Sequence, residues 1–332
     1  MFYFYFNCLL HNYLTMKLPL IIAVTSFVNV IQSSSVIVPS SSATENTKTG
    51  QWVLEWSDEF DGNQVNQTNW NVYADVYEGI NQIELYTANN VWVNNSNLVL
   101  RTHLENVTIN GTTYNVTSGR VDSSFKYNVT VNSRVEVRAM LQADVAIGIH
   151  TAAWLLGYGC WPVTAEVDIF EFEVESPEWI RSTSNYHYGT TCRGDIHHPS
   201  GSYPDAPYGQ NPVNFSNTYH IFAVEWNETS LVFYVNDTAF NSYSSKNITI
   251  PNWDMFIIFS QAYMAARRAN VPDYAWPVYQ YIDYVRVYKW ENSDNTAIEN
   301  GDYPSTIDSV ELNKEQDKID INNKEEFTNQ NA

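Results

Sequence analysis

Near the middle of the chain, residues 161–173 read W-P-V-T-A-E-V-D-I-F-E-F-E. Acidic residues alternate here with large apolar ones, which predicts a β-strand whose successive side chains point to opposite faces. Glu166 and Asp168 therefore share one face. In a regular strand Glu171 points to the other face, but a β-bulge, which inserts one extra residue, returns it to the face of Glu166 and Asp168. Because bulges are frequent beside active sites, the segment predicts a bulged strand with three carboxylates on one side.

Three carboxylates on one strand face repel one another. Such a set requires either that one carboxylate holds a proton or that a cation lies beside it. An acid of raised pKa beside an ionised partner is what retaining glycoside hydrolysis needs, with the two reacting carboxyl groups about 5–5.5 Å apart. The alternative is an acidic strand face exposed to solvent, and the E-x-D-x-x-E pattern alone fits both interpretations.

Aromatic residues around the acidic segment favour the catalytic interpretation. Trp154, Tyr158 and Trp161 lie just upstream of it, and flat aromatic faces suit sugar rings. The whole chain of 332 residues is 15% aromatic, with 11 Trp and 23 Tyr. That composition suits both carbohydrate stacking and an aromatic-rich β core.

Glu166, Asp168 and Glu171, preceded by Trp161 and Pro162, resemble the signature of glycoside hydrolase family 16. Two residues separate the aspartate from the last glutamate, as in the laminarinase (endo-β-1,3-glucanase) branch. The segments W-V-L-E-W-S-D-E-F-D-G, from residue 52, and Y-I-D-Y-V-R-V-Y, from residue 281, resemble the first and last strands of the family. The resemblance implies an all-β fold, a β-jelly-roll sandwich of the concanavalin A-like lectin/glucanase type with a substrate cleft on its concave face.

The resemblance also implies roles for the acidic residues. Glu166 corresponds to the nucleophile, Asp168 to the residue that assists it, and Glu171 to the general acid/base of a retaining endo-glycosidase that hydrolyses β-1,3-glucan. One alternative is a non-catalytic β-glucan-binding protein, which the presence of both glutamates disfavours. The other is a transglycosylase, or a hydrolase of another neutral β-glycan. The segment 260–268 departs from the family, with Ser260 in place of an asparagine, and keeps this alternative open.

Further residues are candidates for substrate binding. Part of this set comes from motifs that resemble the family: N-Q-I-E-L-Y-T resembles a glucan-contacting segment, S-G-R-V resembles T-S-G-R-I, and Y-H-Y-G resembles L-H-Y-G. Trp154 fits a sugar platform and a core position equally well, and His150 stands where the family has a tryptophan. His187 fits a hydrogen bond to the acid/base or the substrate, or a structural role. The candidates are Asn81, Glu84, Arg120, Trp154, Trp161 and His187.

The charge of the chain restricts its partners. The formal net charge is −20, which argues against nucleic acid, an anionic membrane surface or a strongly acidic polysaccharide. A neutral β-glucan polysaccharide is compatible with this charge. No stable membrane partner is expected, and we expect a monomer.

The ends of the chain differ from its centre. Residues 1–35 predict a signal peptide or targeting region, because Lys17 precedes the apolar run 18–31, and small residues follow. The start is Met1 or Met16, and an uncleaved signal anchor is an alternative. Residues 36–50 predict a Ser/Thr-rich linker, 51–290 the catalytic domain, and 291–332 an acidic disordered tail. The chain is therefore predicted to be secreted or signal-anchored.

Cysteines and glycosylation sequons agree with secretion. If Cys8 is removed with the signal peptide, Cys160 and Cys192 remain of the three cysteines, a pair that predicts one disulfide. Two free buried thiols are the alternative. N-x-S/T sequons such as those at Asn66 and Asn106 predict an N-glycosylated chain.

No cofactor is expected to be required. Some relatives bind calcium on the convex face through an early glutamate and the closing aspartate. Glu59 and Asp283 occupy the corresponding positions, so the resemblance implies a structural calcium site there.

Overall fold

The computed structural model describes residues 50–77, 82–142, 148–173, 182–191, 197, 199–203, 215–264 and 275–292. All of them belong to one compact unit, Lys48–Ala332. The predicted signal peptide, nearly all of the linker and most of the acidic tail lie outside these ranges and stay predictions. Within the described ranges no helix is both long enough and apolar enough to cross a membrane.

Two sheets contain nearly all the regular structure of these ranges, and the one helical element is a short 3-10 helix, η1 (Ala88–Asn90). The seven-stranded sheet carries the acidic segment. Its spatial order is β12 (Ser200–Tyr203), β11 (Ser182–His187), β10 (Glu166–Glu173), β9 (Ile149–Gly157), β16 (Met255–Tyr263), β7 (Arg120–Asp122) and β2 (Asn71–Val72).

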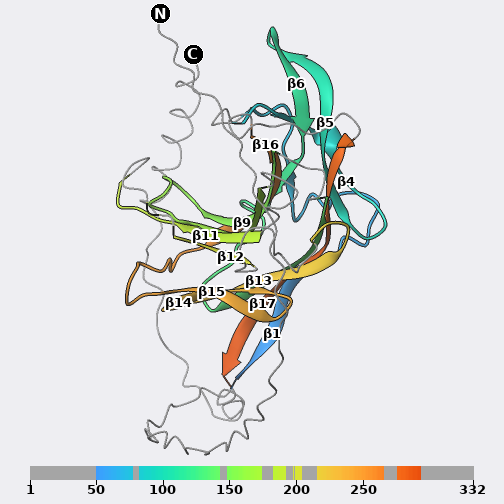
Figure 1. The fold of residues 1–332 in the computed structure, drawn as a ribbon. Helices are drawn as coiled ribbons and strands as arrows, with labels where there is room; N and C mark the ends of the chain where they lie inside the picture. The colour runs from blue at the N-terminus through green and yellow to red at the C-terminus, as the bar shows by residue number, and fades with distance from the viewer. Residues whose placement is uncertain are drawn as a thin grey trace, which may run out of the picture. The chain divides into compact units, whose positions relative to one another are not determined.

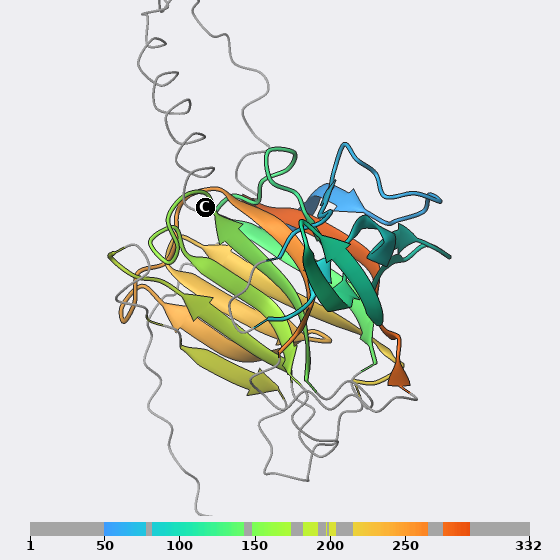
Figure 2. The same cartoon turned by 90° about the horizontal axis from the view of Figure 1, so that it is seen from above.

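The ten-stranded sheet packs against it. Its main path is β15 (Thr238–Ser244), β14 (Ser230–Val235), β13 (Tyr219–Asn227), β8 (Ser133–Leu141), β17 (Val278–Asn292), β5 (Leu98–Ile109), β6 (Thr112–Ser118) and β3 (Leu85–Tyr86). In addition β1 (Gly50–Asp58) pairs with β17, and β4 (Val91–Val93) pairs with β5. Figure 1 shows β9, β11 and β12 over β13, β14 and β15, and Figure 2 shows these layers from above.

Strand periodicity explains how the two layers join. On β8 every second residue, including Val135 and Val137, is buried, while Arg134 and Glu136 between them point to the other face. The rings of Phe170 (β10) and Phe222 (β13) meet across the two sheets with their centroids 4.5 Å apart. The core therefore lies between the sheets, and the predicted all-β sandwich is confirmed.

Candidate active site

The acidic segment forms β10, and this strand carries the predicted bulge. Its register shifts between Asp168 and Phe170 against β9, and between Asp168 and Glu171 against β11. Two consecutive residues, Ile169 and Phe170, both lie in the core, with 1% and 0% exposure. Glu166 and Glu171 remain partly exposed. The extra inward residue therefore returns Glu171 to the face of Glu166 and Asp168.

The turn from β9 to β10 determines where β10 begins. Gly157 at the end of β9 approaches the turn so closely that a Cβ there would lie 1.9 Å from the Thr164 carbonyl oxygen. Ala165 has φ 60°, a left-handed conformation that costs a non-glycine residue on the order of 1–3 kcal/mol. Packing holds Ala165 in this conformation, since it is 1% exposed and its carbonyl accepts the Gly157 N–H at 3.2 Å. Glu166, the next residue, is thus set at the first position of the strand.

A histidine from the neighbouring strand lies against the first two carboxylates. His187 on β11 is the cross-strand partner of Glu166. Its Nε2 lies 3.2 Å from Asp168 Oδ2 and 3.6 Å from Glu166 Oε1. The Trp161 ring lies beside it, with centroids 5.9 Å apart. These contacts link His187 to Glu166 and Asp168.

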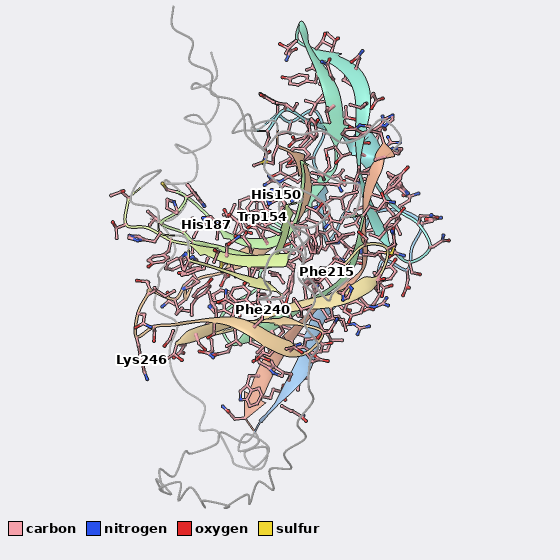
Figure 3. All side chains as sticks on the ribbon, in the orientation of Figure 1. His150, Trp154, His187, Phe215, Phe240 and Lys246 are labelled. Atoms are coloured by element: carbon pink, nitrogen blue, oxygen red, sulfur yellow. The ribbon has the colours of Figure 1, made fainter. Side chains whose placement is uncertain are left out.

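A second histidine lies against the third carboxylate. His150 Nε2 on β9 is 2.8 Å from Glu171 Oε1, and Figure 3 labels His150, Trp154 and His187 on this side of the seven-stranded sheet. Sequence reasoning did not include His150 among the site residues. The alternation of β9 places His150 on the same strand face as Trp154, and this could be predicted from the sequence. The pairing of β9 with β10, which brings His150 to Glu171, could not.

Burial and mutual repulsion raise the pKa values of these carboxyl groups. Burial, followed by the charges of Asp168 and Glu171, raises the pKa of Glu166 to about 8, although His187 and the nearby Trp161 oppose the rise. Burial and the charge of Glu171 also raise the pKa of Asp168, while His150 lowers it. The cluster therefore retains a proton near neutral pH, as expected for carboxylates that repel one another.

The raised pKa of Glu166 predicts a pH-dependent stability that Glu166→Gln removes. From about pH 4.5 to about pH 8 the folded protein binds a proton that the unfolded chain has released. The free energy of unfolding therefore falls as pH rises through this window, by an amount on the order of a few kcal/mol. Urea denaturation at pH 5, 6, 7 and 8 should show that Glu166→Gln gains stability over the wild type as pH rises.

A matched control is Glu228→Gln, at an exposed turn position. Its unfolding free energy should follow the wild-type pH dependence. If Glu166→Gln also ran parallel to the wild type, the carboxyl group of Glu166 would not be the one that retains the proton.

The predicted substrate-binding residues have different surroundings. The Arg120 guanidinium lies over the Tyr73 ring at 4.7 Å and over the Trp154 ring at 5.0 Å, and the Trp154 indole N–H donates to Ser260 Oγ at 3.1 Å. Arg120 on β7 and Trp154 on β9 thus contact each other, and Trp154, the cross-strand partner of Asp168, keeps part of its surface exposed.

Glu84 occupies a more internal position. It is 1% exposed, and its Oε2 accepts the backbone N–H of Tyr263 at 2.8 Å, so it holds the end of β16. Asn81 lies outside the described residues, as does Cys192. The disulfide between Cys160 and Cys192 therefore stays a prediction.

The residues proposed for calcium each face an arginine. Arg286 binds both oxygens of Glu59, at 2.9 and 2.8 Å, and lowers the pKa of that carboxyl group. Arg138 pairs with Asp283. A calcium ion would have to compete with both guanidinium groups, and the calcium site stays a prediction without support from these contacts.

Among the described residues, one group has metal-ligand chemistry. Glu166, Asp168 and His187 each offer one donor atom, all within 4.8 Å of one another. Because the pKa values of both carboxyl groups are raised, a metal ion at neutral pH would have to displace a proton. The donor set suits proton transfer at least as well as metal binding.

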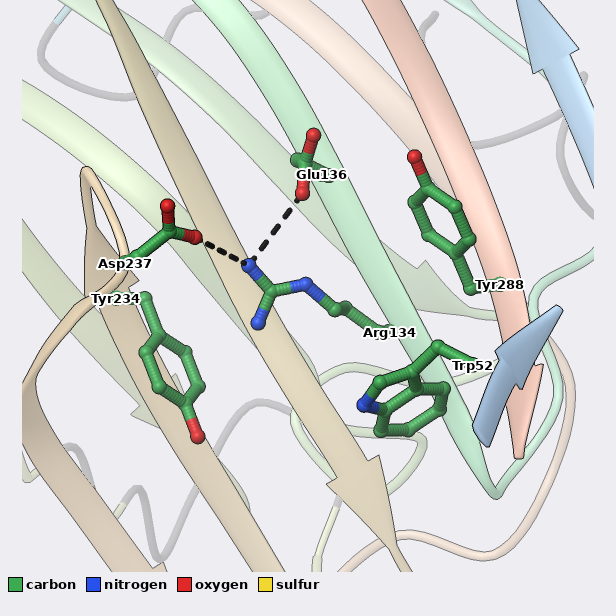
Figure 4. A pocket seen from close by; sticks show the side chains of 6 residues that line it. All are labelled: Trp52, Arg134, Glu136, Tyr234, Asp237 and Tyr288. Carbon is green, nitrogen blue, oxygen red and sulfur yellow. Dashed lines mark hydrogen bonds and ion pairs between the residues drawn. The ribbon is translucent and has the colours of Figure 1, made fainter. Parts of the chain in front are cut away.

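A hollow of about 300 Å³ lies on the ten-stranded sheet (Figure 4). Arg134 at its centre pairs with Glu225 at 2.9 Å, Glu136 at 3.4 Å and Asp237 at 3.5 Å. Its guanidinium is therefore neutralised by the protein itself, and the hollow is best explained as a structural ion network. The lining residues are Trp52, Arg134, Glu136, Tyr234, Asp237 and Tyr288.

Comparison with known proteins identifies similar chains. The family profile described as Glycosyl hydrolases family 16 matches residues 81–286. A glucan endo-1,3-beta-glucosidase A1 of Niallia circulans is 26% identical over 274 residues, which cover 71% of this chain and 38% of the relative. A beta-1,3-glucan-binding protein of Penaeus monodon is 29% identical over 133 residues, which cover 37% of this chain and 34% of the relative. This chain thus spans a minor part of the length of either relative.

Solved structures agree with the fold. The catalytic domain of an endo-1,3-beta-glucanase (laminarinase) from Thermotoga petrophila superposes with a TM-score of 0.62 at 27% sequence identity. The match covers 74% of this chain and 100% of that domain. The similarity therefore extends over the whole of that catalytic domain.

Proposed function

Since the chain belongs to glycosyl hydrolases family 16, we propose that it is a secreted, retaining endo-glycosidase that hydrolyses β-1,3-glucan of the laminarin type. The observation that carries this proposal is the bulge of β10, which places Glu166, Asp168 and Glu171 on one strand face. Retaining hydrolysis needs a carboxylate nucleophile and a protonated carboxyl group on one side of the sugar bond.

In the proposed first step, ionised Glu166 attacks the anomeric carbon while Glu171 protonates the departing glycosidic oxygen. The C–O bond to the leaving sugar breaks, and a glycosyl ester of Glu166 forms. His187 and Trp161 favour the ionised form of Glu166, because both lower its pKa against the effect of burial. In the free protein the pKa of about 8 places the retained proton on Glu166, so the proposed step requires that this proton reside on Glu171 when the glycosidic bond breaks.

In the second step, Glu171 takes a proton from water, and the resulting hydroxide equivalent attacks the same anomeric carbon. The ester bond to Glu166 breaks, so the sugar keeps its original configuration. Asp168, 2% exposed and 3.2 Å from His187 Nε2, holds the histidine beside the nucleophile. Trp154, partly exposed beside β10, suits a sugar platform.

Hydrolysis of a polysaccharide panel tests the proposal. Purified protein is incubated with laminarin, lichenan, xyloglucan and agarose, and new reducing ends are measured. We expect release from laminarin, with oligosaccharides of several lengths as early products of an endo-acting enzyme. Release from another glycan alone would replace the β-1,3-glucan assignment.

A non-catalytic glucan-binding protein is the second candidate, favoured by the similarity to the Penaeus monodon protein. Retention of all three acidic residues argues for the hydrolase. Binding to laminarin without any release of reducing ends would favour the second candidate. Secretion is proposed from the predicted signal peptide and the sequons. We also propose that the chain is a monomer.

A further inference from the structure

The outer face of β9 carries a histidine at one end of the acidic site. Ala153 and Leu155 of β9 lie in the core, so His150, Ala152 and Trp154 lie on the opposite face, the one shared by the carboxylates. His150 is partly buried and sits four residues before Trp154. The sequence has a histidine where the family that it resembles has a tryptophan.

The pairing of β9 with β10 brings this histidine to Glu171. Ala152 is the direct cross-strand partner of Glu171, and His150 lies two positions further along β9. Diagonal neighbours of this kind are close enough for long side chains to meet. Ala152 has a small side chain, and His150 Nε2 reaches Glu171 Oε1 at 2.8 Å.

An imidazole can serve a carboxyl group in both of its protonation states. A ring nitrogen that carries hydrogen donates to a carboxylate, and the other tautomer accepts from a carboxylic acid. The acid/base of a retaining enzyme passes through both states in each catalytic cycle. An indole N–H at the same position could only donate.

From this geometry we propose that His150 is a positioning residue, which holds the Glu171 carboxyl group in the orientation needed to protonate the leaving oxygen. The inference rests on the proposed function, in which Glu171 is the acid/base. His150 itself contacts Glu171 rather than the reacting atoms. Loss of the His150 side chain should therefore lower the rate most on substrates whose leaving group must be protonated before it departs.

The dependence of rate on the leaving group tests this role. We compare kcat/KM of the wild type, His150→Leu and His150→Gln on laminarin and on 2,4-dinitrophenyl β-laminaribioside, whose leaving group departs without protonation. His150→Leu should lose about 10²-fold on laminarin, the effect expected when a catalytic group is misplaced, and less than about 3-fold on the aryl glycoside. His150→Gln, whose amide still reaches the carboxyl group, should recover most of the loss.

His220→Gln is the matched control, since it changes a histidine on β13 of the other sheet. It should match the wild type on both substrates. His150→Asn keeps a polar amide but is too short to reach Glu171, and it should behave like His150→Leu. If His150→Leu does not fold, as judged by its thermal unfolding curve, the Gln and Asn pair decides the question.

Glu171→Ala separates the two levels of the proposal. If Glu171→Ala loses kcat/KM on laminarin but keeps it on the aryl glycoside, while the His150 variants lose kcat/KM on both substrates equally, the positioning role is overturned and the proposed function stands. If Glu171→Ala itself shows no dependence on the leaving group, its assignment as the acid/base fails. Selective loss in both sets of variants supports both statements.

Discussion

Replacing Glu166 with glutamine is expected to lower kcat on laminarin by roughly 10⁴-fold or more. The amide is close in size to the carboxylate but cannot form the glycosyl ester. The fold should be kept, because the substitution removes a charge that burial and two neighbouring carboxylates make unfavourable. Reducing ends released from laminarin, measured together with a thermal unfolding curve, give both quantities.

The control for this experiment is again Glu228→Gln, which removes an exposed glutamate in the turn after β13. It should keep wild-type activity. A folded Glu166→Gln variant with wild-type activity would show that the nucleophile is another group, whatever the glycan proves to be.

Replacing Glu171 with alanine is expected to lower kcat/KM on laminarin by about 10²–10⁴-fold, the usual contribution of general acid catalysis. On a dinitrophenyl glycoside the first step should persist, and the glycosyl ester should accumulate because no base activates water. Sodium azide should then restore turnover, since this small anion needs no deprotonation and the missing side chain leaves room for it.

The configuration of the azide product reports the mechanism directly. Attack on an ester of Glu166 gives the β-glycosyl azide, which NMR distinguishes from the α form. Glu166→Gln serves as the control, and it should yield no azide product by this route. An α-azide, or no increase in rate with azide, would contradict double displacement at these two residues.

Local patterns were sufficient to predict the central strand and its irregularity. The alternation in residues 161–173 indicated a strand, and the position of Glu171 indicated a bulge that returns it to the face of Glu166 and Asp168. The repulsion of three carboxylates indicated a retained proton or a nearby cation. The bulge and the raised pKa of Glu166 are both present in β10, because each depends on residues that are neighbours in the chain. The sandwich was predicted through the family resemblance and through strands that have one apolar face.

Contacts between strands distant in sequence were not predictable in this way. The contact between His150 and Glu171 depends on the register of β9 against β10, which no property of either segment alone determines. The same holds for Glu59, which accepts a hydrogen bond from Arg286 of β17. It also holds for Glu84, which accepts a hydrogen bond from a backbone N–H of β16. Such pairs arise from the assembly of the sheets and leave no periodic signal in the sequence.

Because of the bulge, the number of residues between Asp168 and Glu171 can change only in whole steps, each of which adds or removes an inward side chain. Ile169 and Phe170 both fill the interior, so deleting either one would restore a regular strand and move the following glutamate by one position. The residues after the deletion would keep their inner and outer sides, because regular alternation then places Glu171 outward and Phe172 inward without a bulge. No gradual series of spacings connects the two arrangements, and a change from one to the other requires simultaneous repacking of the interior beneath the site.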